Sequence, residues 1–216
     1  MTREGPCKSS SRLVEIGRRV LMSESAALTE LARQLDDNFS RVVDLVYECK
    51  GHVIITGIGK SGHVGRKIAA TMASTGTPAF FVHAAEAVHG DLGMITADDV
   101  VIAISNSGET EDVVRLVSPI RLIGAKIIAM TGNVDSSLAK QSDALLPCFV
   151  AGEADPLNLA PTNSTAAALG LGDALAVALM TIRGFGEDDF ARYHPGGSLG
   201  KRLQVQKICG SMQREG

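Results

Sequence analysis

Two short segments of the chain hold the residue types that bind phosphate groups. The first is Gly-Ile-Gly-Lys-Ser-Gly at positions 57–62, directly after the apolar run 53–56. Glycines allow a sharp turn and let the backbone approach an anion. The helix expected after them presents free N–H groups and the positive end of its dipole. Gly59, Lys60 and Ser61 are therefore candidate contacts of a phosphate.

The first segment also fits other interpretations. Its G-x-G-x-x-G pattern is that of a dinucleotide-binding turn, but no acidic residue ends the next apolar run, and Glu86 is the nearest candidate. It fails as a nucleotide P-loop, because Ile54 stands where that pattern needs glycine. A tight turn with Lys60 in solvent is the simplest alternative.

The second segment is Ser-Asn-Ser-Gly-Glu-Thr at 105–110, between an apolar run and an expected helix. A helix cap accounts for one hydroxyl, but not for Ser105, Ser107 and Thr110 together. With Asn106 and the backbone N–H groups, these side chains form a candidate phosphate cradle. Neither segment has an adjacent Asp suited to magnesium, so a small phosphomonoester fits better than a nucleoside triphosphate.

The elements that must position these segments follow from the apolar pattern. Continuously apolar strands separated by helices indicate a parallel sheet covered on both faces. We therefore predict an α/β fold, a doubly wound three-layer sandwich with a five-stranded parallel sheet. The predicted strands are 53–56, 79–82, 100–104, 126–130 and 144–148, the last at an edge because it contains Pro147. The predicted helices are 12–50 (one long helix or a hairpin), one ending near 74, 111–123 and 164–183.

The composition is that of a soluble protein of one domain. The chain has 216 residues, of which 45% are hydrophobic and 21% are charged. The net charge of −3 and the absence of Trp argue against nucleic acid or a membrane as partner. Its four cysteines are too scattered for a disulfide framework or a zinc site. The polar N-terminus lacks a signal peptide and no run reaches ~18 apolar residues, so we expect a cytoplasmic protein.

Three motifs together resemble those of the sugar isomerase (SIS) domain family. They are the segments 57–62 and 105–110, and His-Pro-Gly-Gly-Ser-Leu-Gly at 194–200. Further similar stretches lie at 73–78, 89–94 and 159–165. Within the family, the chain is similar to the D-arabinose 5-phosphate isomerases, without their C-terminal CBS pair. The resemblance divides the chain into a disordered tail (1–11), a SIS domain (12–203) and a C-terminal tail (204–216).

The resemblance implies a homotetramer that interconverts D-ribulose 5-phosphate and D-arabinose 5-phosphate without metal or cofactor. In many Gram-negative bacteria, this product feeds the synthesis of Kdo for lipopolysaccharide. By the same resemblance, Lys60, Glu153 and His194 are active-site groups, and Asp112 stands where the family has Glu. The phosphate and substrate would be held by residues of the three motifs and of 89–94, namely Gly59, Ser61, Ser105, Asn106, Ser107, Thr110 and His89.

The chemistry of such an isomerase needs few groups. A base removes a proton beside the carbonyl, an enediol forms, and a proton returns to the neighbouring carbon. Glu153, His194 and Asp112 are the candidate bases, and Lys60 is a candidate electrophile or phosphate partner. The long apolar N-terminal segment is expected to bury partly against another copy of the chain. In such an oligomer, His194, on a C-terminal turn, could reach a neighbouring subunit's site.

Several alternatives stay open from the sequence. The chain could be a phosphosugar-binding regulatory module, an isomerase of another sugar phosphate, or an oxidoreductase that uses the G-x-G-x-x-G turn. Three histidines, His83, His89 and His194, could form an inhibitory zinc site if they converge. We expect His83 and His89 to flank Glu86 in a loop.

Overall fold

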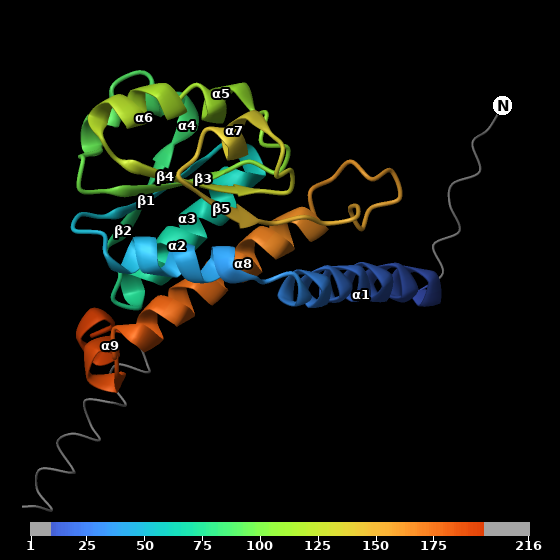
Figure 1. Ribbon diagram of the computed structural model, residues 1–216. Coiled ribbons are helices and arrows are strands. Elements are labelled where there is room, and N and C mark those ends of the chain that lie inside the picture. The colour runs from blue at the N-terminus through green and yellow to red at the C-terminus, as the bar shows by residue number, and fades with distance from the viewer. Residues whose placement is uncertain (1–9, 197–216) are drawn as a thin grey trace, which may run out of the picture.

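Five parallel strands form the central sheet of the protein, which a computed structural model describes over residues 10–196 (Figure 1). Their order is β2-β1-β3-β4-β5, and both β1 and β3 are buried along their full length. The α/β fold predicted from the apolar runs is thus confirmed, with Pro147 ending the edge strand β5. The strands are β1 Val53–Gly57, β2 Ala79–His83, β3 Val100–Ile104, β4 Lys126–Thr131 and β5 Ala144–Pro147.

The chain reverses its direction of progress across the sheet between β1 and β3. It leaves β1 to form β2 on one side, and then returns to pair β3 with the other side of β1, where Val53 is in register with both Ala79 and Val100. Ligands of open α/β sheets bind at such a switch point, outside the carboxyl ends of the strands. The loops after β1 and β3 both begin at this place.

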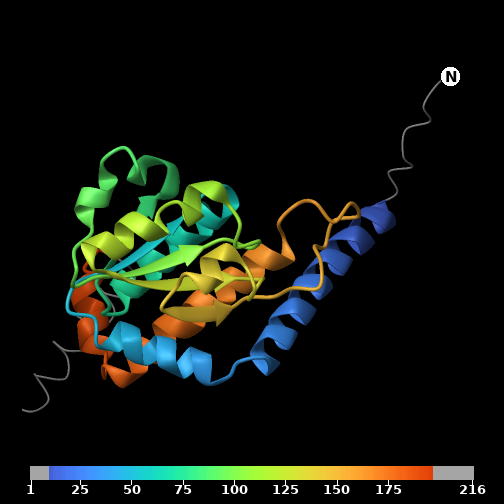
Figure 2. The ribbon, with the colours of Figure 1, turned by 45° about the horizontal axis from the view of Figure 1, so that its top comes forward.

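Helices cover both faces of the sheet, as Figure 2 shows. One face packs against α2 (Asp37–Tyr47), α3 (Gly59–Ser74) and α8 (Asn163–Ile182), and the other against α4 (Ala84–Ala87), α5 (Glu111–Val114), α6 (Val117–Ile123) and α7 (Ser137–Lys140). Side chains alternate across each strand, so Ile55 enters the first layer and Ile54 the second. A short 3₁₀ helix, η1, spans Asp91–Met94.

The predicted N-terminal helical stretch consists of two helices. Helix α1 (Ser10–Arg33) runs away from the sandwich, and α2 begins after a break at which Asp36 accepts the N–H of Asn38 at 2.9 Å (Figure 1). Leu31 is the one buried residue of α1. Several of its large apolar side chains are exposed, namely Leu13, Val14, Ile16, Leu21, Met22 and Leu28. The predicted tail overlaps α1 at residues 10–11, and its remainder lies outside the described residues, as does the whole of 204–216.

Two local predictions need correction. The predicted helix 111–123 is interrupted, because the N–H of Leu116 bonds to Val113 three residues back and closes α5 with a tight turn. The predicted loop around Glu86 is instead the short helix α4, which His83 caps by accepting the N–H of Ala85 at 3.3 Å. The small helices α7 and α9 (Glu187–Tyr193) were not predicted.

Helix α8 is long and apolar enough to cross a membrane by length and composition alone. It nevertheless packs against α1, α2 and α3, and buries residues of its own such as Leu171 and Leu175 against the sheet. The core helix of a soluble protein passes the same test of length and composition.

Candidate active site

The first loop leaves the amino end of α3 open. Gly59 begins the helix at φ +57°, a left-handed conformation that disfavours other residues. Ile58 occupies the N-cap position and offers no side-chain hydrogen bond to the first N–H groups. Lys60 is exposed on the first turn, and Ser61 is half-buried. The loop therefore presents uncapped N–H groups and a cation at the switch point, which is the arrangement that binds an anion.

The second loop is built around its own hydroxyls. Ser105 is 1% exposed, its Oγ shares a hydrogen bond of 2.8 Å with the Oγ1 of Thr110, and it accepts the N–H of Gly108 at 3.1 Å. Ser107 Oγ accepts the N–H of Glu109 at 3.2 Å. The three hydroxyls thus organise the loop itself. Gly108 is required because its φ is +68° and a Cβ would lie 2.0 Å from Ser136 Oγ.

The second loop is also tied to the elements beside it. The carbonyl of Asn106 accepts the N–H of Gly132 at 3.0 Å, and the carbonyl of Gly108 accepts the N–H of Leu138 at 3.1 Å. Glu109 Oε1 accepts the N–H of Ser137 at 2.8 Å, and the hydrogen bonds from Ser137 lower the pKa of Glu109. This loop is therefore preorganised before any ligand binds.

Two hollows lie near the carboxyl ends of the strands. The smaller holds about 70 Å³ between α3, α8 and the second loop, and its lining includes Ser61, Asn106 and Ser164. Cys148 lines it too, and burial raises the pKa of that thiol to about 12. The larger, about 660 Å³, lies between α1 and residues 149–153 and is lined by Glu153. Since ligand pockets usually exceed ~300 Å³, the smaller hollow can hold only part of a sugar phosphate.

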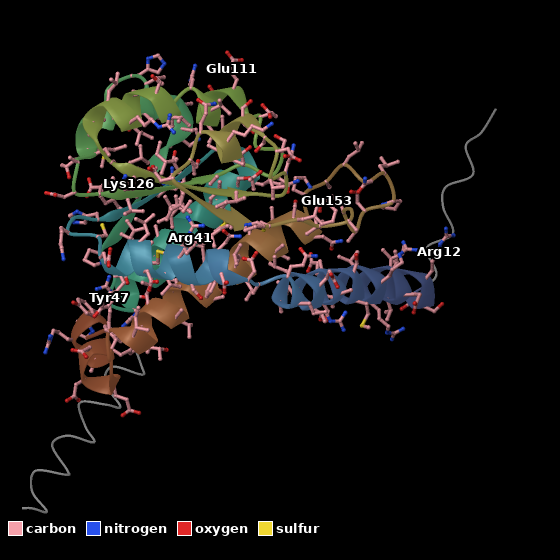
Figure 3. All side chains as sticks on the ribbon, in the orientation of Figure 1. Arg12, Arg41, Tyr47, Glu111, Lys126 and Glu153 are labelled. Atoms are coloured by element: carbon pink, nitrogen blue, oxygen red, sulfur yellow. The ribbon has the colours of Figure 1, made fainter. Side chains whose placement is uncertain are left out.

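Glu153 lies where the loop that precedes α8 begins, as Figure 3 shows. Its Oε2 accepts the N–H of Thr162 at 2.8 Å, the Oγ1 of Thr162 at 3.1 Å and the N–H of Ser164 at 3.2 Å, and its Oε1 accepts the hydroxyl of Ser164. Burial raises the pKa of Glu153, but the hydrogen bonds from Ser164 and Thr162 together lower it below its ordinary value. An ionised carboxylate thus caps the amino end of α8, where the helix dipole favours it.

The loop between Glu153 and α8 is held by further side-chain bonds to its backbone. Asp155 accepts the N–H groups of Leu157, Leu159 and Ala160 within 2.9 Å. Asn158 has a φ of +54°, and its Oδ1 accepts a hydrogen bond from the N–H of Glu153 at 2.6 Å. This network fixes where the Glu153 carboxylate lies relative to α8.

Asp112 lies on α5, just beyond the second loop. It forms an ion pair of 2.5 Å with Arg115, one turn along, and is about one-third exposed. Glu111 points to solvent at the edge of the molecule (Figure 3). Helix α4 packs against α5, and the exposed His89 follows it. The structure therefore puts His89 and Asp112 on neighbouring elements, outside the two hollows.

His194 lies far from these groups within its own chain. It ends α9, stacks on Phe190 with ring centroids 3.9 Å apart, and bonds through Nδ1 to the carbonyl of Phe190 at 3.0 Å. Arg183, which follows α8, bonds to Thr77, just before β2, and to Val46, in the last turn of the helix α2 that leads to β1, so this end of α8 lies at the amino ends of the strands (Figure 1). Glu153 caps the opposite end of the same helix.

The predicted zinc site does not form within one chain. Over residues 10–196, no three His, Cys, Asp or Glu side chains gather as metal ligands. His83 is engaged as the cap of α4 and His194 lies across the sandwich, so His83, His89 and His194 do not converge. Sequence reasoning also missed the roles of Thr162, Ser164 and Glu109. The Thr-x-Ser sequence at a helix start was a signal for the first two.

Comparisons with known proteins agree with this architecture. The family model of the SIS domain matches residues 45–178. The arabinose 5-phosphate isomerase KpsF of Escherichia coli O6:H1 (strain CFT073) is 54% identical, over 94% of this chain and 62% of its own length. The arabinose 5-phosphate isomerase KdsD of Pseudomonas aeruginosa is also 54% identical, over 89% of this chain and 59% of its own.

A solved structure from E. coli CFT073, in complex with arabinose 5-phosphate, matches with a TM-score of 0.85 and 42% identity, covering 87% of this chain and all of that one. The chain spans about three fifths of the length of the curated relatives that it matches. The matched region includes all five strands and both loops at the switch point. On these grounds, the chain belongs to the SIS domain family.

Proposed function

We propose that this protein is an aldose-ketose isomerase that interconverts D-ribulose 5-phosphate and D-arabinose 5-phosphate. The observation that supports the proposal is the pair of loops at the switch point, one with an uncapped helix end and one built of hydroxyls. Ser164, which donates to the carboxylate of Glu153 at the start of α8, lines the hollow that these loops share. The similarity to arabinose 5-phosphate isomerases over nearly the whole chain supports the choice of sugar.

In the proposed mechanism, the phosphate binds at the amino end of α3 and in the second loop. The N–H groups of α3, the ammonium of Lys60 and the loop hydroxyls would hold its oxygens. A carboxylate removes the proton from C2 of the aldose, and the C–H electron pair becomes the double bond of the enediol. The carbonyl oxygen takes up the proton that the C2 hydroxyl gives up, the protonated carboxyl group returns its proton to C1, and the oxygen on C2 becomes the carbonyl.

Glu153, Asp112 and His194 are the groups proposed for proton transfer. Glu153 is ionised over a wide pH range, since the hydrogen bonds from α8 outweigh the burial that raises its pKa. Asp112 is shorter by one methylene than the Glu that the family resemblance implies at this position and is paired with Arg115, so it would act at closer range or through water. His194 would serve the site of another copy, because α8 separates it from Glu153.

We also propose a homotetramer. The exposed apolar side chains of α1 and the distance of His194 from its own Glu153 both favour assembly. Light scattering at micromolar concentration should give four times the mass of 22.6 kDa. A fully active monomer would rule out the sharing of His194 between subunits.

The reaction is proposed to need no metal or cofactor. It is proposed to take place in the cytoplasm and to supply Kdo synthesis. The catalytic unit is proposed to be one SIS domain over 12–203. Activity should survive a chelator, and excess zinc should inhibit if assembly brings His83, His89 and His194 together. A chelator-sensitive activity that metal restores would contradict the metal-free mechanism.

The test of the main proposal is an isomerase assay over a panel of pentose and hexose phosphates, with unphosphorylated ribulose as the matched control. We expect turnover of ribulose 5-phosphate and none of ribulose. Equal affinity for the two sugars would exclude the phosphate loops as the binding site. Tight binding of sugar phosphates without turnover would instead favour a regulatory module, the alternative that the shortened acid Asp112 suggests.

A further inference from the structure

The hydroxyl of Ser164 lies between the smaller hollow and the carboxylate of Glu153. Ser164 is the second residue of α8 and is 6% exposed. Its Oγ donates to Oε1 of Glu153, while its backbone N–H donates to Oε2 at 3.2 Å. Ser164 also lines the smaller hollow together with Ser61 and Asn106, whereas Glu153 lines the larger one. The carboxylate and the hydroxyl thus lie between the two hollows.

The two oxygens of Glu153 have different surroundings. Oε2 accepts three hydrogen bonds, from the N–H and Oγ1 of Thr162 and the N–H of Ser164. Oε1 accepts one hydrogen bond from within residues 10–196, the hydroxyl of Ser164. Each carboxylate oxygen has two lone pairs, which the three donors on Oε2 must share, whereas Oε1 has one donor and keeps a lone pair for a proton from a substrate. Its single partner also lines the hollow beside the phosphate loops.

We propose that Ser164 is a positioning residue, which aims Oε1 of Glu153 at the substrate and stabilises the carboxylate in both of its protonation states. The inference rests on the proposed isomerase function. While Glu153 is ionised, the hydroxyl donates to Oε1. When Oε1 has taken the proton from the substrate carbon, the same hydroxyl can rotate and accept from it, because a serine hydroxyl is both donor and acceptor.

The proton balance of this step closes within the site. The C–H bond of the substrate breaks, its electron pair forms the C1–C2 double bond, and the π pair of the carbonyl moves onto the C1 oxygen, which takes the proton that the C2 hydroxyl gives up. The proton from carbon resides on Oε1 until it is returned to C1, and the C2 oxygen then becomes the carbonyl. No oxidant or reductant is required. Ser164 gains and loses no proton overall, so it is distinct from the base itself.

The charges around Glu153 leave Ser164 and Thr162 as its principal partners. Burial raises the pKa of Glu153 and the hydrogen bonds from Ser164 and Thr162 lower it. On α1, Glu30 and Arg33 line the same large hollow and pair with each other at 3.5 Å. On the loop, Asp155 is engaged with three backbone N–H groups. The first turn of α8 carries no charged residue.

The decisive variant is Ser164→Ala, assayed for kcat and KM from pH 5 to 9, with Ser164→Thr as the rescue. We expect kcat to fall about tenfold for alanine with KM within threefold, and the acidic limb of the profile to move to higher pH because the carboxylate loses a donor. Ser164→Thr should restore both. If the alanine variant does not fold, Ser164→Cys, with a weak donor of similar size, gives the same test.

The matched control is Ser74→Ala, at the far end of α3, where a half-buried hydroxyl bonds to the carbonyl of Thr71 at 3.0 Å. This change should leave the pH profile unmoved. An NMR titration of the Glu153 carboxyl carbon in wild type and Ser164→Ala measures the effect of the same hydrogen bond on the pKa of Glu153, without turnover. An unmoved titration would overturn the inference even in an active enzyme, and a moved titration would support it if the isomerase proposal itself failed.

Discussion

The two loops at the switch point occupy equivalent places in the fold and are built in different ways. Each follows a buried strand and leads into a helix. In the second loop the hydroxyls form hydrogen bonds within the loop, such as the one between Ser105 and Thr110. Glu109 anchors this loop to α7. The first has an uncapped helix end and an exposed Lys60. In the proposed function, a phosphate would thus contact a preorganised cradle on one side and free donors on the other.

Because of this difference, substitutions in the two loops should have different effects on ligand binding and on the stability of the fold. Groups that are already bonded in the empty protein cost little ordering when a ligand arrives, but their removal also weakens the fold. Groups that are free in the empty protein contribute only when the ligand is present. Substitution of the exposed Lys60 in the first loop should therefore change activity alone, whereas substitutions in the buried part of the second loop should change activity and stability together.

The largest effect is expected for Lys60→Ala in the first loop. If Lys60 contacts the phosphate and the developing oxyanion as proposed, its removal should lower kcat/KM by about a hundredfold or more, at unchanged melting temperature. The control is Lys67→Ala on the same helix, whose ammonium pairs with Asp173 and should matter little to activity. Steady-state kinetics and thermal unfolding of both variants measure the contrast. Activity of Lys60→Ala within threefold of wild type would show that this charge is not used.

The next effect concerns the acid just after the second loop. Asp112→Ala should lower kcat by about a hundredfold if Asp112 transfers a proton. Glu111→Ala should cost only a few tenths of a kcal/mol through the helix dipole, because that side chain points to solvent (Figure 3).

Arg115→Ala separates catalysis from the ion pair of Asp112. Equal losses in Asp112→Ala and Arg115→Ala would assign Asp112 to local structure. Loss of activity in Glu111→Ala would mean that the catalytic acid is one position earlier than proposed.

The sequence predicts the sheet and both loops because each depends on local signals. Runs such as 100–104 are short, continuously apolar and rich in β-branched residues, which favours central strands buried on both faces, and glycine and serine clusters mark the turns after them. The break after α5 depends on a single tightened turn, which residue periodicity over 111–123 does not reveal.

The site was less predictable because its groups meet through long-range contacts. Glu153 caps α8 only because the Asp155 and Asn158 bonds fold the intervening loop back onto the helix start. The position of His194 depends on the length of α8, whose 20 residues span about 30 Å. Motif similarity identifies such residues but does not say that they lie at opposite ends of one helix.

A smaller effect should distinguish the two serines of the second loop. Ser105→Ala and Ser107→Ala should each weaken sugar phosphate binding by about 1–3 kcal/mol through a lost charge-assisted bond. Only Ser105 is buried, so only Ser105→Ala should also lower stability, by about 1 kcal/mol. Calorimetric titration and thermal unfolding test the pair. Equal melting temperatures for the two variants would contradict the preorganised cradle.

The smallest effect concerns Glu109, which anchors the second loop to α7. Hydrogen bonds from Ser137 lower the pKa of Glu109 from its ordinary value of 4.5. A carboxyl whose pKa is lower in the folded state stabilises the fold above its unfolded-state pKa. That contribution disappears as the pH falls from about 4.5 through the lowered value. Glu109→Gln removes the ionisation but keeps an oxygen that can accept the Ser137 N–H.

The melting temperature of Glu109→Gln should therefore lie below that of wild type at pH 7, and the two should converge in acid. Glu111→Gln makes the same change of charge two residues away on a side chain that points to solvent, and should show no such convergence. Activity of Glu109→Gln should stay within threefold of wild type, since Glu109 holds the loop and need not touch the substrate. A gap between Glu109→Gln and wild type that persists unchanged at pH 3 would mean that the anchor does not depend on the carboxylate charge. The contrast between the two loops would then rest on the serine and threonine hydroxyls alone.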